Sequence, residues 1–170
     1  MLAFEIYTDR EALYTTHLNS AVMSGFLSAL PETMITGLDL SNYEDVGGFL
    51  DRFNDKRECE VMVDVRISCK PEARQALLSR LSTLASIISE SDYKGVLTFF
   101  VLKSLDSEQG VRIFQRFQSW KAQTNHVSDQ PVLNFWRSSK EDILSMESQA
   151  YVPNGKGWLH RGSSQPTARL

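Results

Sequence analysis

Apolar and polar side chains alternate along the segment Glu58–Cys69. The apolar positions of this segment are Cys59, Val61, Val63, Val65, Ile67 and Cys69. A period of two predicts a β-strand with one face in a core and the other face mostly in water. After Pro71, which suits the first turn of a helix, leucine and isoleucine recur at helical spacing as far as Ile88. This second pattern predicts an amphipathic helix that packs on the sheet.

Four further segments complete a structural unit with this strand and helix. Val96–Leu102 and Val111–Gln118 are predicted to be neighbouring strands of a hairpin. A helix is expected from about Trp120, with an interruption near Pro131, and a last strand is expected around Leu144–Val152. The resulting order of elements, β-α-β-β-α-β, is ferredoxin-like.

One stretch of the chain occurs twice, each time with a histidine at its centre. The first copy contains Phe4, Glu5, Ile6, Tyr7, Ala12, His17, Ser20 and Phe26. The second copy contains Phe114, Gln115, Arg116, Phe117, Ala122, His126, Asp129 and Phe135. The copies are 110 residues apart before the histidine and 109 residues apart from it onward, so one inserted residue in the first copy explains the difference. Two related modules are therefore expected.

The repeat predicts how the chain is divided. Residues 1–41 are expected to be a partial module of order β-α-β, with strands at Leu2–Tyr7 and Met34–Leu40. Residues 42–57, which include two adjacent glycines, are expected to be a linker, 58–159 a complete module, and 160–170 a mobile polar tail. The partial module lacks a β-α-β opening. Either the protein naturally has one and a half modules, or this start lies inside a longer reading frame.

The partial module also predicts self-association. Two strands and one helix cannot cover both edges of a sheet, and exposed edges invite pairing with another strand. The partial sheet could pack on the complete one within a chain, yet the place of the missing β-α-β unit would stay unfilled. We therefore expect a homodimer.

Charge and composition limit the classes of partner. The chain has 18 basic and 21 acidic residues, a net charge of -3, and no cluster of lysine and arginine on a predicted face. Nucleic acid and anionic membranes are therefore not expected as partners. The N-terminus has no signal-peptide pattern and the longest apolar run is too short to span a bilayer, so we expect a soluble cytoplasmic protein. The histidines at positions 17, 126 and 160 have no metal-ligand spacing, so no metal is expected. The sequence also has no Gly-rich phosphate-binding loop that would indicate another cofactor.

The two copies, Phe4–Tyr7 with His17 and Val111–Phe117 with His126, resemble the antibiotic biosynthesis monooxygenase (ABM) family, in particular the small tandem versions in fungal genomes. The resemblance implies an α+β fold, a ferredoxin-like dimeric α+β barrel, with one complete and one partial ABM-like module in tandem. It also implies a pocket between each sheet and its helices. One departure is visible, because the glutamate usual on the third strand is Gln115 in the second copy.

The function implied by this resemblance is a cofactor-independent oxygenase, or a related decarboxylase or cyclase. Its substrate would be an aromatic, polyketide-like phenol, anthrone or quinol of secondary metabolism. Such chemistry needs only a base, an apolar slot and donors for a developing oxyanion. The alternative is a non-catalytic protein that binds a small ligand or dimerises, with a degenerate ABM module.

Histidine is the candidate general base of this chemistry. His126 is expected on or beside the apolar face of its helix, where a neutral imidazole could accept a proton near neutral pH. A histidine held by a backbone carbonyl is the structural alternative. His17 occupies the corresponding place in the first copy. Tyr7 and Glu5 are the candidates for hydrogen bonding within the pocket of that copy, with structural polar contacts as the alternative.

Four residues of the second copy are candidate substrate contacts. Trp120 and Trp136 could stack on a flat aromatic ring, although tryptophans more often pack in cores. Asn125 could donate to a quinone-like oxygen, with solvation as the alternative. Arg116 could stabilise an enolate, although a paired surface arginine is the more frequent role.

Overall fold

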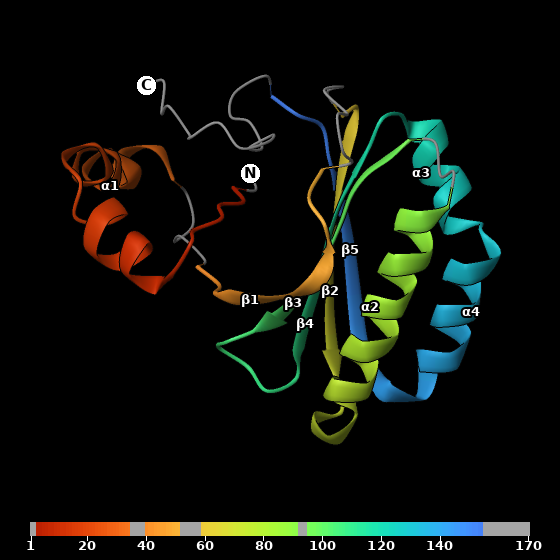
Figure 1. Cartoon of the computed structure of the whole chain (residues 1–170). Coiled ribbons are helices and arrows are strands. Elements are labelled where there is room, and N and C mark those ends of the chain that lie inside the picture. Colours follow the sequence, from red (N-terminus) through yellow and green to blue (C-terminus); the bar gives the residue numbers. More distant parts are fainter. Residues whose placement is uncertain (1–2, 35–39, 52–58, 92–94, 155–170) are drawn as a thin grey trace. The chain divides into compact units, whose positions relative to one another are not determined.

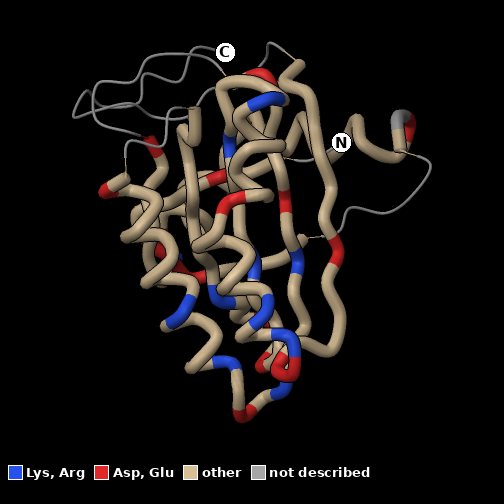
Figure 2. The backbone as a smooth tube through the Cα atoms, turned by 90° about the vertical axis from the view of Figure 1, so that its right-hand side faces the viewer, with Lys and Arg blue, Asp and Glu red and all other residues tan. Residues whose placement is uncertain are grey.

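The computed structural model describes residues 3–34, 40–51, 59–91 and 95–154. The chain divides into two compact units, Met1–Leu40 and Ser41–Leu170. None of the described helices is long and apolar enough to cross a membrane. Basic and acidic positions are interspersed along the described chain (Figure 2).

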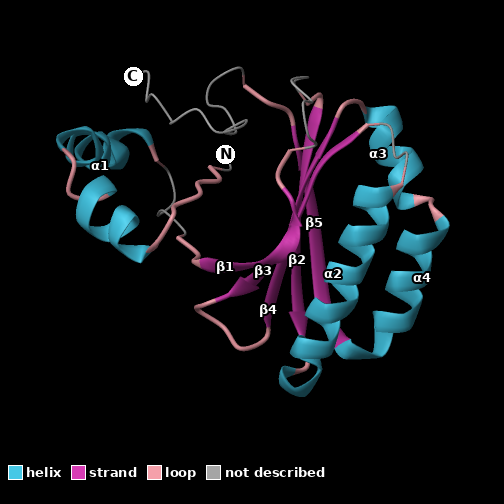
Figure 3. Cartoon of the chain, viewed as in Figure 1, coloured by secondary structure: helices cyan, strands magenta, loops and turns pink. Residues whose placement is uncertain are grey.

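The larger unit is an antiparallel five-stranded sheet with helices on one face (Figures 1 and 3). Its strand order is β1-β3-β4-β2-β5. The strands are β1 (Tyr43–Phe49), β2 (Val61–Cys69), β3 (Val96–Ser104), β4 (Gly110–Phe117) and β5 (Ile143–Tyr151). The helices are α2 (Arg74–Glu90), α3 (Trp120–Val127) and α4 (Gln130–Ser139), with short 3-10 turns at Pro71–Ala73 and Lys140–Asp142. The run from β2 to β5 confirms the ferredoxin-like order predicted from the sequence.

The core lies between the sheet and the helices, as the periodicity predicted. The alternating residues of β2 are buried on the helix side, and they meet the apolar face of α2. The core positions on these two elements are Val61, Val63, Val65, Ile67, Cys69, Leu77, Leu78, Leu81, Leu84, Ala85 and Ile88. Burial of this continuous apolar face is the main stabilising term for the layer of helices.

Strand β1 occupies a segment that the sequence predicted to be linker. It pairs antiparallel with β3, and the register shifts between Asp45 and Gly47. Gly48 has φ +103°, and a Cβ there would lie 2.0 Å from the carbonyl oxygen of Phe99. The two glycines that suggested a loop instead allow an irregular edge strand to approach β3 closely.

The face of β2 opposite the helices differs from the prediction of a mostly wet surface. Asp64 is 1% exposed and accepts two hydrogen bonds from Arg112, at 2.5 Å from Nε and 2.8 Å from Nη2. Arg66 Nε donates to the same carboxylate at 3.1 Å. Burial opposes the charge of Arg112, but the contacts with Asp64 outweigh it and raise the arginine pKa. A buried carboxylate needs such partners, and here they come from β4 as well as from β2.

The smaller unit contains a π-helix at Ala12–His17 and α1 at Ala21–Thr33. The strand predicted at Leu2–Tyr7 does not form over residues 3–7, and this prediction was wrong there. A short alternating segment makes a strand only beside another strand, and residues 3–34 contain none. The strand predicted at Met34–Leu40 lies largely outside the described residues. The strands of the partial module are therefore not seen in the described part of this unit.

Candidate functional site

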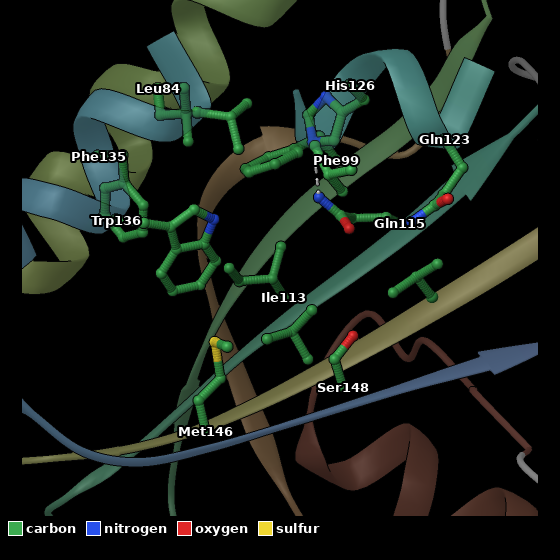
Figure 4. Close-up of a pocket in the computed structure, with 14 residues that line it drawn as sticks. Leu84, Phe99, Ile113, Gln115, Gln123, His126, Phe135, Trp136, Met146 and Ser148 are labelled. Carbon is green, nitrogen blue, oxygen red and sulfur yellow. Dashed lines mark hydrogen bonds between the residues drawn. The ribbon is translucent and has the colours of Figure 1, made fainter. Parts of the chain in front are cut away.

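A cavity of about 150 Å³ lies between the sheet and the helices of the larger unit (Figure 4). Apolar side chains from β2, β3, β4, α2, α3 and α4 make up most of its wall. Its polar lining residues are Gln115 and Ser148 from the strands and Gln123 and His126 from α3. No lining residue carries an acidic or basic side chain other than the imidazole of His126. The site is thus an apolar slot with a few hydrogen-bonding groups, the usual composition of a small-molecule pocket.

The start of α3 places His126 over the sheet. Ser119 caps this helix, because its side chain accepts a hydrogen bond from the backbone N–H of Ala122. Gly95 has φ +111°, and a Cβ at this position would lie 2.6 Å from Cβ of Ala122. The missing side chain at Gly95 therefore lets the first turn of α3 approach the start of β3. One turn after Ala122, His126 enters the core and is 1% exposed.

Aromatic rings and one amide surround the imidazole of His126. Its ring centroid lies 5.9 Å from that of Phe99 and 5.2 Å from that of Phe117. The Nε2 atom lies 3.1 Å from Nε2 of Gln115 (Figure 4). Because an amide nitrogen donates, Gln115 donates to a neutral ring whose own hydrogen is at Nδ1.

Burial sets the ionisation of His126. Desolvation of the charged form lowers the pKa of His126 to about 4. The side chain is therefore neutral near pH 7. It can accept a proton at Nε2, although as a weaker base than an exposed histidine.

The cavity has a closed end and an open end. The closed end is formed by His126, Phe99 and Ile113, each of which is 1% exposed. The other end reaches β5 at the edge of the described sheet, where Met146 is 53% exposed and Ser148 is also exposed. The indole of Trp136 is partly buried and packs against Phe135 with ring centroids 4.8 Å apart. The cavity is therefore open on the β5 side, and Val127 of α3, which also lines it, is 45% exposed.

The structure brings together only some of the site residues predicted in the second copy. His126 and Trp136 both line the cavity. Trp120 is 45% exposed at the start of α3, and Asn125 is exposed on the same helix, and neither lines the cavity. Arg116 lies on the opposite face of β4, where it donates to Asp51 at 3.1 Å.

The three site residues predicted in the first copy lie together in the smaller unit. The Tyr7 hydroxyl donates to Oε2 of Glu5 at 2.5 Å, and Nε2 of His17 lies 3.8 Å from the same oxygen. The rings of Tyr7 and His17 are 5.3 Å apart. Burial, and then the Glu5 carboxylate, raises the pKa of Tyr7. The side chain of Glu5 is 54% exposed and that of His17 37% exposed, so this cluster is open to solvent.

Several cavity residues were missed from the sequence. Met146 and Ser148 come from the last strand, where the register pairs Ser148 with Val65 and Met146 with Ile67. A ferredoxin-like order places the last strand beside the first, so this pairing could have indicated which side of β5 faces the helices. Gln115 was noted only as a departure from glutamate, and Gln123 carries no signal in the sequence. Among the described residues, no group of three or more histidine, cysteine, aspartate or glutamate side chains could hold a metal ion.

Comparisons with known proteins agree with this geometry. Residues 60–139 match the family model described as antibiotic biosynthesis monooxygenase (ABM). A search of curated proteins finds no significant match.

Three solved structures illustrate the shared fold. A Fusobacterium nucleatum protein named "putative monooxygenase" superposes with a TM-score of 0.69 and 13% identity over 79% of this chain and 61% of that one. A "putative antibiotic biosynthesis monooxygenase" of Deinococcus radiodurans superposes with a TM-score of 0.52 and 19% identity, over 60% of this chain and 99% of that one. Rv0793 of Mycobacterium tuberculosis superposes with a TM-score of 0.52 and 22% identity, over 58% of this chain and 98% of that one. The chain thus spans less than two thirds of the Fusobacterium protein and nearly all of the other two. Residues 60–139 are thus similar to the ABM family, and the larger unit has the ferredoxin-like α+β fold of these structures.

Proposed function

We propose that the protein is a cofactor-independent oxygenase, or a related decarboxylase or cyclase, that acts on an aromatic phenol, anthrone or quinol of polyketide-like type. The observation that carries this proposal is a neutral histidine at the closed end of an apolar cavity in an ABM-like domain. His126 is the proposed general base, and Trp136 is the proposed stacking partner of the substrate.

The first step would be transfer of a hydroxyl proton to His126. An incoming hydroxyl takes the place of the Gln115 amide at Nε2, and the proton moves to this nitrogen. The displaced amide then donates to the phenolate oxygen, where the negative charge develops. A quinol treated in this way takes one oxygen atom from O₂ and leaves as a hydroxyquinone, and the other atom leaves as water. An anthrone takes one oxygen atom from O₂, and the other atom leaves as water.

The lowered basicity of His126 limits which hydroxyl groups can react. Transfer of a proton from a phenol with a pKa of about 10 to a base with a pKa of about 4 costs about 8 kcal/mol of free energy. A turnover of about one per second allows a barrier of about 17 kcal/mol. The proton transfer therefore fits within the barrier, and more acidic hydroxyl groups are favoured.

The direct test is oxygen uptake with a panel of quinols and anthrones. We expect uptake with the wild type and a loss of at least about a hundredfold with His126→Gln, which keeps a neutral side chain in the core. Lys121→Ala, an exposed change on the same helix, is the control and keeps wild-type uptake. No turnover of any substrate by the wild type would overturn the proposal.

A non-catalytic ligand-binding protein is the second candidate. It is favoured by the same low pKa and by Gln115, a neutral amide that gives His126 no carboxylate partner. Binding of an aromatic compound in the cavity without any oxygen uptake would support this candidate over the oxygenase.

Two further proposals concern assembly and the smaller unit. We propose a homodimer, which predicts twice the 19.3 kDa chain mass in light scattering across a dilution series, and a monomer mass would contradict it.

We also propose that Glu5, Tyr7 and His17 form a second polar site, with Glu5 holding both other side chains. Its test is whether His17→Ala changes oxygen uptake independently of His126→Gln.

A further inference from the structure

We infer that the cavity accepts a single aromatic ring. The hydroxyl of this ring lies at His126, and the substituent on the opposite side of the ring extends past Met146 toward solvent. Trp136 is the residue that excludes larger ring systems. The substrate class would then be single-ring phenols with an apolar substituent para to the hydroxyl. The inference rests on the proposed function for turnover, but the binding it describes can be measured without turnover.

The first argument is volume. The cavity measures about 150 Å³, and an engineered apolar protein cavity of roughly this size holds benzene. A fused three-ring skeleton has roughly twice the atoms of one ring and needs correspondingly more space in a close-packed interior. One ring therefore fits and a three-ring anthrone does not, so the inference narrows the proposed substrates to the single-ring compounds among them.

The second argument is the contrast between the two ends of the cavity. The closed end is built from fully buried side chains of α3, β3 and β4, which cannot move without disturbing the core. The polar pair His126 and Gln115 lies at this end, whereas Met146 and Ser148 form the open end on β5 (Figure 4). A hydroxyl at the polar pair therefore directs the opposite side of the ring toward β5.

The third argument is the chemistry of the open end. Met146 presents a flexible apolar thioether that is 53% exposed, and such a side chain adapts to different apolar groups. Trp136 lies on α4, across the cavity from β5, and its partly buried indole takes up space that a second ring would need. These two residues suit a chain-like apolar substituent and not a fused ring.

Isothermal titration calorimetry without oxygen tests the inference through three probes: 4-propylphenol, its isomer 2-propylphenol, and anthrone. For the wild type we expect 4-propylphenol to bind at least about tenfold more tightly than the other two. The 2-isomer carries its chain beside the hydroxyl, where it would collide with the fully buried side chains of Phe99 and Ile113. The inference would be overturned if 2-propylphenol or anthrone bound the wild type as tightly as 4-propylphenol does.

Trp136→Ala should enlarge the cavity and strengthen anthrone binding by about tenfold, while the same change at Trp120, outside the cavity, should leave all three affinities unchanged. If Trp136→Ala does not fold, as judged by circular dichroism, Trp136→Phe provides a smaller enlargement with the same expected direction. Unchanged anthrone binding in a folded Trp136 variant also contradicts the inference. Selective binding of 4-propylphenol with no oxygen uptake would refute the oxygenase alone and leave the inference intact.

Discussion

The side-chain amide of Gln115 on β4 donates to Nε2 of His126 on α3 across 3.1 Å, within an apolar cavity. A neutral donor therefore holds the imidazole, where a carboxylate would have stabilised its charged form. The pKa of His126 of about 4 follows from burial without such compensation.

Gln115→Glu should raise the pKa of His126 from about 4 toward its ordinary value near 6.5, because a carboxylate beside Nε2 favours the imidazolium. The measurement is an NMR titration of the imidazole C–H resonances. Gln149→Glu, an exposed position on β5, is the matched control, since it adds the same charge away from the cavity. An unmoved His126 titration in the Gln115 variant would show that the two side chains are not in contact.

The folded protein should lose stability as the pH falls from about 6.5 to about 4. The pKa of His126 is lower in the folded chain than in the unfolded chain, so in this window the unfolded chain binds more protons. The loss in free energy of unfolding from this group is about 3 kcal/mol. His126→Gln removes this contribution. The difference in free energy of unfolding between wild type and this variant, measured by chemical denaturation, should therefore shrink as the pH is lowered. Parallel curves for the two proteins would rule out a depressed pKa.

Gly95→Ala should destabilise the larger unit by roughly 2–5 kcal/mol. The new Cβ would lie 2.6 Å from Cβ of Ala122, and φ of +111° is unfavourable for alanine. The midpoint of thermal unfolding measures the effect. The double variant with Ala122→Gly relieves the collision but not the backbone strain, so it should recover only part of the loss. A single variant as stable as wild type would contradict the close approach of α3 to β3.

Asp64→Asn should cost about 3–5 kcal/mol, because it leaves the buried Arg112 without its carboxylate. Glu44→Gln removes an acid that pairs with Lys103 from a largely exposed position, and it should cost less than about 1 kcal/mol. Urea denaturation of both variants compares the buried pair with the exposed one. Similar small losses would mean that Asp64 is not buried as described.

The sequence predicted the elements whose apolar spacing is regular over many residues. The alternation of β2 and the helical spacing of α2 were both confirmed, since each face meets the same core. The prediction failed where the signal was short. Residues 4–7 alternate over too few positions, and Gly47 and Gly48 suggest a loop although they permit a bulged strand.

The site was predictable only in part, for a related reason. His126 was expected beside a pocket and lies in the wall of the cavity. Adjacent residues of a strand point to opposite faces, so Gln115 and Arg116 cannot both face the cavity, and this rule could have separated them. Met146 and Ser148 depend on the register between β5 and β2, which no local pattern specifies.

Strand β5 is both the edge of the described sheet and one wall of the cavity entrance. Its outer backbone groups are open to pairing, so a strand from a second molecule that joined this edge would lie beside Met146 and Ser148. Mass action would then link occupancy of the cavity to self-association, and the apparent affinity for a small molecule would change with protein concentration.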